Sequence, residues 1–329
     1  MKPSNPLRRL LLATASVLIA TMGHTAIAQE TYPSKPVTLI VPFTPGGSND
    51  VIARVIGQRL SQIWQQPVVV DNRAGAAGSI GTDHVAKAAA DGYKLLITNN
   101  NTMSINPVLL PNTPYAVPRD FAQITQLGVV PVVLAVNANV KARTVKELID
   151  LAKSVPGKLS YASSGAGSPQ HLSAELFKSM TATDIVHVPY KGAAPAITDL
   201  LGGQVDLQFG AINSLLPHIR SGKLRALAVG GAQRASLLPD VPTIAEAGLP
   251  RYESEIWLGL AAPAGTPAAI IRRINTDVAK VLEEPAVKEK LAEQGIETRS
   301  STPQEMAKLV ERDTERWSSV IKSAGIKAE

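Results

Sequence analysis

Apolar and polar positions follow two alternating periods along most of this chain. Short apolar runs, such as residues 37–42 and 94–98, have the length of buried strands. Residues 49–64, between them, carry apolar side chains at the three-to-four spacing that gathers them on one helix face. Because strand and helix patterns alternate nearly throughout, the sequence predicts an α/β protein whose parallel-rich sheets are covered by helices.

The expected elements form two units joined by two extended segments. Residues 127–137 are a long extended run that crosses into a second unit, and residues 256–262 form the return crossing. Strands are expected at residues 37–42, 68–71, 94–98, 159–162, 185–189, 205–209 and 224–229, and helices at 49–64, 80–90, 145–154, 169–180, 195–201 and 303–323. The sequence therefore predicts two α/β units that share two connecting strands.

The domain boundaries follow from these crossings. We place the first domain at residues 29–130 and 253–329, and the second domain at residues 131–252. A proline-rich stretch, residues 106–118, and residues 230–255 show no clear period and are expected to be irregular. The last helix carries an apolar stripe, which we expect to dock on the first domain.

Several helices have recognisable starting signals. Serine or threonine directly before a helix, often with proline at the first helical position, is typical of an N-cap. The expected cap residues are Ser48, Thr144, Ser168, Thr266 and Thr302. Thr144 also precedes Glu147 by three positions, which fits a capping box.

Three glycine- and serine-rich turns each join an apolar strand to a helix. They are residues 39–50 (LIVPFTPGGSND), 68–81 (VVVDNRAGAAGSIG) and 159–171 (LSYASSGAGSPQH). A turn that opens onto a helix presents unpaired backbone N–H groups and the positive end of the helix dipole, and both attract an anion. Since two turns fall in the first domain and one in the second, the sequence predicts a small acidic ligand held between the domains.

Residues 1–28 have the features of a cleavable secretory signal peptide. Lys2, Arg8 and Arg9 precede an apolar stretch that is too short to span a membrane, and a small-residue cleavage signal ends at Ala28. No cysteine stands at the cleavage site, which excludes a lipid anchor. We therefore expect cleavage after Ala28 and export of a soluble protein to the periplasm.

The composition excludes several classes of protein. The chain has no cysteine, so disulfides, thiol nucleophiles and thiolate metal ligands are all excluded. The formal charge is +6, and removing the three positive residues of the leader leaves +3 on the mature chain. Its lysines and arginines are dispersed, and aromatic residues make up only 4% of the chain, so we expect no nucleic-acid partner.

The sequence lacks recognisable motifs for catalysis or metal binding. Ser163 and Ser164 do not form a G-x-S-x-G elbow, and the glycine spacing matches neither a dinucleotide fingerprint nor a P-loop. His171 and Glu175 share a helix face, but no third metal ligand is indicated. We expect the histidine to lie near the helix start and the glutamate to be solvated. No catalytic residue, metal ligand or cofactor is assigned, and the protein is not expected to be an enzyme.

The same turns carry a resemblance to a known family. The chain resembles the Bug-type solute receptors of tripartite tricarboxylate transporters over essentially its whole mature length. The segments that carry the resemblance are residues 32–36 (YPSKP), 42–50 (PFTPGGSND), 72–78 (NRAGAAG), 163–168 (SSGAGS) with His171 and Leu172, 188–192 (VPYKG), 199–206 (DLLGGQVD), 224–229 (LRALAV) and 238–243 (LPDVPT). Each segment alone is modestly specific, whereas their order and spacing together are highly specific.

The resemblance implies a fold, a ligand and a site. The fold is a two-domain periplasmic-binding-protein fold of the Venus-flytrap, type II-like kind, with two crossover strands. The ligand is a small mono-, di- or tricarboxylate held mostly by backbone amides, hydroxyls and water. Carried over by position, the ligand-binding residues are Phe43, Pro45, Gly46, Gly47, Ser48, Gly78, Ser79, Ser163, Ser164, Gly165, Ser168 and Tyr190. The implied partners are membrane permease subunits of a tripartite transporter or a sensor kinase, and we expect a monomer.

Two departures from the family pattern bear on the ligand. Gly210 stands where many relatives have an acidic residue, which disfavours a ligand whose amino group needs a carboxylate partner. Asn99, Asn100 and Asn101 replace small hydroxyl residues, and they either read additional polar groups or cap the following turn. The sequence leaves three functions open: a transport receptor, a receptor that acts on a membrane sensor, and an exported enzyme using the same cleft.

Overall fold

The computed structural model describes residues 32–327. The chain separates into two compact units, residues 1–34 and 35–329, and the second contains every strand and helix of the described part. The expected signal peptide and its cleavage site lie outside the described residues. Within the described part, no helix combines the length and the apolar character needed to cross a membrane.

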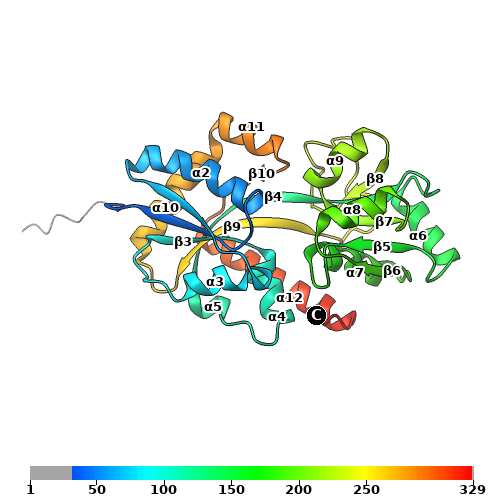
Figure 1. Ribbon diagram of the computed structural model, residues 1–329, viewed down its shortest axis with the longest axis horizontal. Coiled ribbons are helices and arrows are strands. Elements are labelled where there is room, and N and C mark those ends of the chain that lie inside the picture. The colour runs from blue at the N-terminus through cyan, green and yellow to red at the C-terminus, as the bar shows by residue number, and fades with distance from the viewer. Residues whose placement is uncertain (1–31, 328–329) are drawn as a thin grey trace, which may run out of the picture. The chain divides into compact units, whose positions relative to one another are not determined.

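Strands and helices alternate along the second unit (Figure 1). The strands are β1 (Val37–Val41), β2 (Val68–Asn72), β3 (Lys94–Asn99), β4 (Phe121–Asn137), β5 (Ser160–Ser163), β6 (Val186–Pro189), β7 (Leu207–Ala211), β8 (Leu224–Val229), β9 (Glu255–Pro263) and β10 (Glu297–Thr298). The α-helices are α2 (Ser48–Trp64), α3 (Ser79–Ala86), α4 (Asn106–Leu109), α5 (Val117–Asp120), α6 (Val145–Ser154), α7 (Pro169–Thr181), α8 (Ala193–Leu201), α9 (Ile212–Arg220), α10 (Ala268–Glu283), α11 (Pro285–Glu293) and α12 (Pro303–Ser323). A 3₁₀ turn, η1 (Ala76–Gly78), and a π-helical turn, η2 (Asn101–Ile105), complete the described elements.

The strands pair in the order β2-β1-β3-β9-β4-β7-β5-β6, with β8 and β10 also paired to β4. We call β1, β2, β3, β10 and their helices the first lobe, and β5 to β8 with α6 to α9 the second lobe. In the first lobe, β1 pairs in parallel with β2 and β3. In the second lobe, β5 pairs in parallel with β6 and β7. Each lobe thus contains the parallel strands that the alternating pattern predicted.

Two antiparallel strands connect the lobes. Along β4, the residues up to Pro131 pair with β9, and those from Val132 onward pair with β7 and β8. Figure 1 shows β4 and β9 running side by side between the two groups of elements. The change of partner at Pro131 lies next to the domain boundary predicted between residues 130 and 131.

Each lobe has its own apolar core. In the first lobe, Ile40, Leu96 and Trp257 pack with side chains of α12. In the second lobe, Phe177 and Phe209 pack together with the aromatic ring of Tyr252. Burial of such side chains is the main stabilising contribution available to a chain without disulfides.

The C-terminal helix α12 contacts both lobes. Met306 and Val310, in its first half, belong to the core of the first lobe, as expected. Trp317 and Ile321, in its second half, pack against Leu172 of α7 in the second lobe. The helix therefore docks on the first lobe as expected, and its apolar stripe also extends to the second lobe.

The structure corrects several local expectations. The stretch 106–118, which was expected to be irregular, contains α4 and the start of α5, and α9 occupies residues for which no helix was expected. The helix expected at residues 80–90 ends at Ala86. Ser48 is the first residue of α2 and does not cap it; the N-cap is Gly47, without a side-chain hydrogen bond. Pro267, not Thr266, is the N-cap of α10.

Thr144, Ser168 and Thr302 are N-caps as expected, but the capping box expected at Thr144 is not formed. The hydroxyl of Thr302 accepts from the backbone N–H of Glu305, whose side chain accepts in return from the Thr302 N–H. Thr144 accepts from the backbone N–H of Glu147, but that glutamate bonds the N–H of Arg143 rather than that of the cap. Ser168 caps α7 by accepting from the N–H of His171.

Candidate functional site

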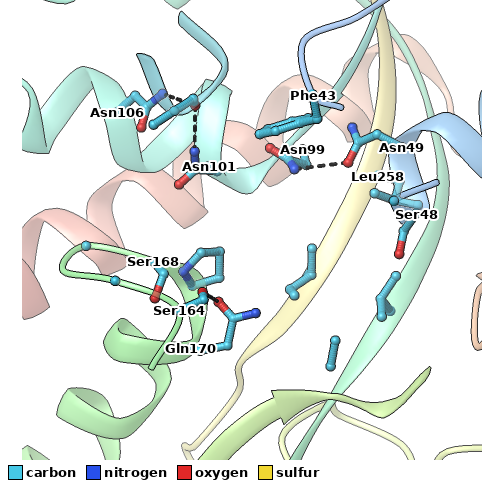
Figure 2. Close-up of a pocket in the computed structure, with 18 of the residues that line it drawn as sticks. Phe43, Ser48, Asn49, Asn99, Asn101, Asn106, Ser164, Ser168, Gln170 and Leu258 are labelled. Atoms are coloured by element: carbon cyan, nitrogen blue, oxygen red, sulfur yellow. Dashed lines mark hydrogen bonds between the residues drawn. The ribbon is translucent and has the colours of Figure 1, made fainter. Parts of the chain in front are cut away.

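A cavity of about 610 Å³ is lined by residues of both lobes and of the two connecting strands. Figure 2 shows Phe43, Ser48, Asn49 and Asn99 on one side of it, and Ser164 and Gln170 on another. The lining residues are Phe43, Gly46, Gly47, Ser48, Asn49, Ala77, Asn99, Asn101, Asn106, Leu109, Leu110, Val130, Ser164, Gly165, Ala166, Gly167, Ser168, Pro169, Gln170, Ala211, Asn213, Ser214, Ile256 and Leu258. Among these described residues there is no side chain with a formal charge.

The start of α2 forms the first-lobe wall. Gly46 and Gly47 leave β1 through a turn in which Gly46 has a φ of +90°, a conformation that a side chain disfavours. The backbone N–H of Gly46 donates to Asp50 Oδ2 at 3.0 Å, inside the same helix start. Ser48 and Asn49 occupy the first turn of α2, where backbone N–H groups lack intrahelical partners. This wall can therefore offer amide and hydroxyl donors together with the positive end of a helix dipole.

Asparagine side chains extend this wall. Asn99 Nδ2 donates to Asn49 Oδ1 at 3.2 Å, and the amides of Asn101 and Asn106 both donate to Ala77 O at 2.9 Å. Figure 2 shows these bonds along the first-lobe side of the cavity. The asparagine run was expected either to read polar groups or to cap the following turn. Asn99 Oδ1 accepts from the Thr102 N–H of that turn at 3.2 Å, and Asn99 also lines the cavity, as does Asn101. Asn100 instead donates to the backbone of β9 at Glu255.

The turn before α7 forms the second-lobe wall. Residues from Ser164 to Gln170 line the cavity, and Ser164 Oγ donates to Gln170 Oε1 at 3.0 Å. Gly165 and Gly167 have φ values of +131° and +72°, so the turn depends on glycine at both positions. Ser168 Oγ accepts from the backbone N–H of His171 at 3.2 Å. This wall, like the first, ends at the N-terminus of a helix.

A third helix start was missed from the sequence. Ala211, Asn213 and Ser214 line the cavity at the beginning of α9. The apolar side chains of this helix do recur at helical spacing, at Ile212, Leu215, Leu216 and Ile219. That spacing could have identified the helix, although Pro217 lies inside it, where proline normally argues against a helical assignment.

The packing of β7 on α9 also explains the departure at Gly210. A Cβ added to Gly210 would lie 2.6 Å from Leu215 Cδ1, so an acidic side chain here would require the Leu215 side chain to move. Glycine here permits the close approach of helix and strand.

The floor of the cavity is apolar. Val130 of β4 and Ile256 and Leu258 of β9 lie between the two walls. Donors at two opposed walls and hydrocarbon between them suit a small acid with an aliphatic body. Dipoles and amides can bind such an acid without any cationic side chain.

Seven of the expected site residues line the cavity and five do not. Those that line it are Phe43, Gly46, Gly47, Ser48, Ser164, Gly165 and Ser168. Those that do not are Pro45, Gly78, Ser79, Ser163 and Tyr190. The residues that sequence reasoning left out of the site come mainly from α9, from η2 and α4, and from the crossing strands.

Most of the remaining five lie one layer behind the wall. Gly78 packs under the wall, because an added Cβ would meet the ring of Phe43 at 3.1 Å and Thr102 at 2.8 Å. Ser79 Oγ accepts from Asn106 Nδ2 at 3.3 Å. The hydroxyl of Tyr190 donates to Asp199 instead of facing the cavity.

Of the two α7 side chains, His171 lies where it was expected, whereas Glu175 does not. His171 lies at the helix start, and burial lowers its pKa to about 4, with the neighbouring His187 acting in the same direction. Glu175 is not solvated, because its Oε1 accepts from the Tyr161 hydroxyl at 2.5 Å and from Lys178 Nζ at 2.7 Å. Across the described residues, no three His, Asp or Glu side chains are grouped so that they could hold a metal ion.

Comparison with known proteins identifies the family. A family profile described as the tripartite tricarboxylate transporter family receptor matches residues 52–326. Protein BugT of Bordetella pertussis is 41% identical over 319 residues, which make up 96% of this chain and 98% of BugT. The chain belongs to the tripartite tricarboxylate transporter receptor family.

Solved structures of similar proteins agree with this family. A structure of R. palustris Rpa4515 with adipate is 41% identical, has a TM-score of 0.78 and covers 90% of this chain and 99% of that one. MatC from Rhodopseudomonas palustris with bound malate is 32% identical, with a TM-score of 0.74 over 88% of this chain and 100% of MatC. The predicted family and the predicted two-domain fold are confirmed. The prediction of a solute-binding receptor rather than an enzyme is confirmed as well.

Proposed function

We propose that this tripartite tricarboxylate transporter receptor binds a small carboxylate in the cavity and delivers it to the membrane permease subunits of its transporter. The observation that carries the proposal is the lining itself: the first turns of α2, α7 and α9 meet at one cavity without a charged side chain. Anions bind at helix N-termini through exposed N–H groups and the helix dipole. The similar structures with adipate and with malate support the ligand class.

The arrangement of donors favours an acid with carboxylates at both ends. One carboxylate would lie at the α2 wall near Ser48, and the other at the α7 wall near Ser168. The aliphatic body would then rest on Ile256 and Leu258 of the apolar floor. A ligand with an ammonium group fits less well, because no carboxylate among the described lining residues would pair with it.

Ligand binding should stabilise the protein and draw the lobes together, since the two walls come from different lobes. We propose that residues 29–130 with 253–329, and residues 131–252, are the two bodies that close. Titration of the purified protein with adipate, malate and citrate, followed by calorimetry and by thermal unfolding, tests the ligand class. An acid at about 100 times its dissociation constant should add roughly 2.7 kcal/mol to the free energy of unfolding.

Small-angle scattering and product analysis provide the controls. Saturating ligand should reduce the radius of gyration, and the acid should be recovered unchanged. No stabilisation by any of a broad panel of carboxylic acids would contradict the proposal, and turnover of the acid would point to an enzyme. Loss of uptake of the acid in a strain without the permease subunits would support transport. Intact uptake together with loss of the transcriptional response to the acid, in a strain without this receptor, would point to a sensor kinase.

We also propose that the protein acts in the periplasm after cleavage at Ala28. The charged, apolar and small-residue regions of residues 1–28 occur in the order that export requires. Intact-mass measurement of the protein from a periplasmic extract should give a chain that begins at or near Gln29. A full-length chain retained in the membrane fraction would contradict this.

A further inference from the structure

A buried histidine and a half-buried one lie stacked behind the second-lobe wall. His171 belongs to the first turn of α7 and His187 to β6, and their ring centroids are 3.9 Å apart at an interplanar angle of 14°. The ring of Tyr161, from β5, stacks on His187 with the ring centroids 4.8 Å apart. The proposed binding of a carboxylate does not use either histidine, since neither lines the cavity.

Each histidine is bonded to a different part of the glycine turn. The backbone N–H of Gly167 donates to His171 Nδ1 at 2.9 Å. His187 Nε2 lies 2.7 Å from Ser163 Oγ, which also accepts from the Gly165 N–H at 3.2 Å. Both ends of the segment from Ser163 to Ser168 are therefore tied to the stacked pair.

These bonds require His171 to be neutral. An amide N–H can donate only to an unprotonated ring nitrogen, so Nδ1 of His171 is an acceptor and its proton is on Nε2. A second proton would place a donor against a donor and remove the bond to Gly167. It would also place a positive charge against the ring of His187.

Burial favours this neutral state and Lys178 acts in the same direction, whereas Glu175 opposes it. The charged groups that act on the pair are Glu175 and Lys178, both on α7, and they pair with each other. Glu175 also accepts from the hydroxyl of Tyr161 on β5. Burial is the largest effect on both histidines and lowers the pKa of each.

We propose that His171 and His187 are positioning residues of the carboxylate site, which hold the Ser163–Ser168 turn in its binding shape through a neutral stacked pair. The inference rests on the proposed carboxylate site for its effect on affinity. The shape of the turn itself can be tested without a ligand. Loss of the Nδ1 acceptor or protonation of His171 frees the turn, and ordering it again opposes binding.

The first experiment uses the protein without ligand. Nitrogen-15 NMR of the wild-type protein should show His171 Nδ1 unprotonated at pH 7 and coupled to the Gly167 amide. Hydrogen exchange should find the amides of Gly165 and Gly167 protected at pH 7, with protection lost in step with protonation of the imidazoles. Protection that persists after both rings are charged would overturn the proposal.

The second experiment compares variants in calorimetry with adipate as the probe. His171→Leu keeps an apolar side chain but removes the acceptor, and we expect affinity to fall about tenfold, the equivalent of one hydrogen bond. His171→Asn supplies Oδ1 close to the position of Nδ1 and should restore affinity to within about threefold of wild type. His218→Asn, near the C-terminal end of α9, is the matched control and should bind as wild type.

The outcomes separate this inference from the proposed function. If wild type binds neither adipate nor malate, the proposed function fails, while NMR and exchange still decide the role of the histidines. If wild type binds and His171→Leu binds equally well with equal amide protection, the positioning role is wrong. If His171→Leu does not fold, the pH titration of amide protection in wild type and the His171→Asn variant still test the role. A folded His171→Asn that keeps the protection of the turn amides but loses affinity for adipate would contradict the positioning role.

Discussion

The glycine turns of the two cavity walls are held by side chains of different chemistry. Each begins with a glycine turn, and each turn donates one backbone N–H to a side chain four residues further along, inside the helix. In the first lobe, Gly46 donates to Asp50 Oδ2 at 3.0 Å. In the second lobe, Gly167 donates to His171 Nδ1 at 2.9 Å. We call these two side chains braces. The brace of the first lobe is the carboxylate of Asp50, and that of the second lobe is the neutral ring of His171.

The carboxylate brace is part of an ionic network. Arg54 donates to both oxygens of Asp50 at 2.9 Å, and Asn72 Nδ2 adds a further bond to Oδ1. Burial by itself raises the pKa of Asp50, but the hydrogen bonds from Arg54, Gly46 and Asn72 hold that pKa below its usual range. Arg54 is more than half exposed, so solvent supports its charge.

The histidine brace has no comparable partner of opposite charge. Its side chains are held by stacking and by neutral hydrogen bonds. The comparison shows that a helix start can be kept in binding shape with or without a charged side chain. The two braces should therefore fail under different conditions, and substitution, urea and acid can each expose that difference.

The largest effect is expected from a negative charge at the second-lobe wall. Asp caps a helix about as well as Ser, so Ser168→Asp should keep the bond to the N–H of His171 and the melting temperature of the empty protein. Its charge would face the proposed position of a ligand carboxylate in a partly desolvated cavity. We expect calorimetry to show adipate binding weakened at least about a hundredfold.

Ser168→Asn is the matched control for that variant, because asparagine caps well and carries no charge. It should bind adipate far better than Ser168→Asp. Equal affinity of both variants, close to wild type, would remove this turn from the ligand site and leave only the first-lobe wall.

Replacing each brace by asparagine should lower the free energy of unfolding by different amounts. Asp50→Asn keeps an oxygen for Gly46 but deprives Arg54 of its charged acceptor, and hydrogen bonds to charged groups stabilise by about 1.5–3 kcal/mol. We therefore expect urea unfolding to show a loss of about 2 kcal/mol for Asp50→Asn and a clearly smaller loss for His171→Asn. Equal losses of unfolding free energy in the two variants would mean that the charged bonds of Arg54 to Asp50 add no stability.

The braces should also differ in their response to acid. An unfolded histidine takes up its proton near pH 6.5, whereas burial keeps His171 neutral down to about pH 4 in the folded protein. The unfolded state then binds more protons in this window, so the free energy of unfolding falls as the pH falls from about 6.5 to about 4. With solvent screening taken into account, we expect a loss of about 1–2 kcal/mol.

Asp50 sets the contrast in that experiment. The pKa of this carboxylate is lowered, so its stabilisation is complete above its unfolded pKa and is lost only at more acidic pH, below about 4. Urea unfolding of wild type, His171→Asn and Asp50→Asn between pH 7 and pH 4 measures the contribution of His171, and the same measurements below about pH 4 measure that of Asp50. If the free energy of unfolding of His171→Asn falls with pH as steeply as that of wild type, groups other than His171 cause the acid sensitivity.

Local patterns in the sequence predicted the walls of the site better than its interior. The glycine turns, the cap at Ser168 and the crossing strands depend on neighbouring residues, and such signals can be read from one segment at a time. The apolar spacing of α9 indicates a helix, although Pro217 lies inside it. The short helices α4 and α5 fall in the proline-rich stretch 106–118, where proline obscures a helical pattern.

Pairings between distant segments were beyond the sequence patterns. His171 and His187 meet only because β6 lies beside β5 in the folded sheet. Ser163 and Tyr190 were expected to face the ligand, but their positions follow from hydrogen bonds to His187 and Asp199. Hydrophobic period and turn chemistry carry no information about such contacts, and the resemblance gave positions along the chain without their depth in the fold.

The smallest effect tests the two serines that begin the helices of the two walls. Ser168 is a true N-cap, so Ser168→Ala should lower the free energy of unfolding by about 1 kcal/mol as well as weaken binding. Ser48 is the first helical residue behind Gly47 and caps nothing, so Ser48→Ala should leave the urea midpoint unchanged. Figure 2 shows Ser48 beside the cavity, and loss of one hydroxyl donor there should weaken adipate binding by about tenfold or less. Equal loss of stability in both variants would indicate that Ser48 supports the helix start after all, and the two walls would then be more alike than their hydrogen bonds suggest.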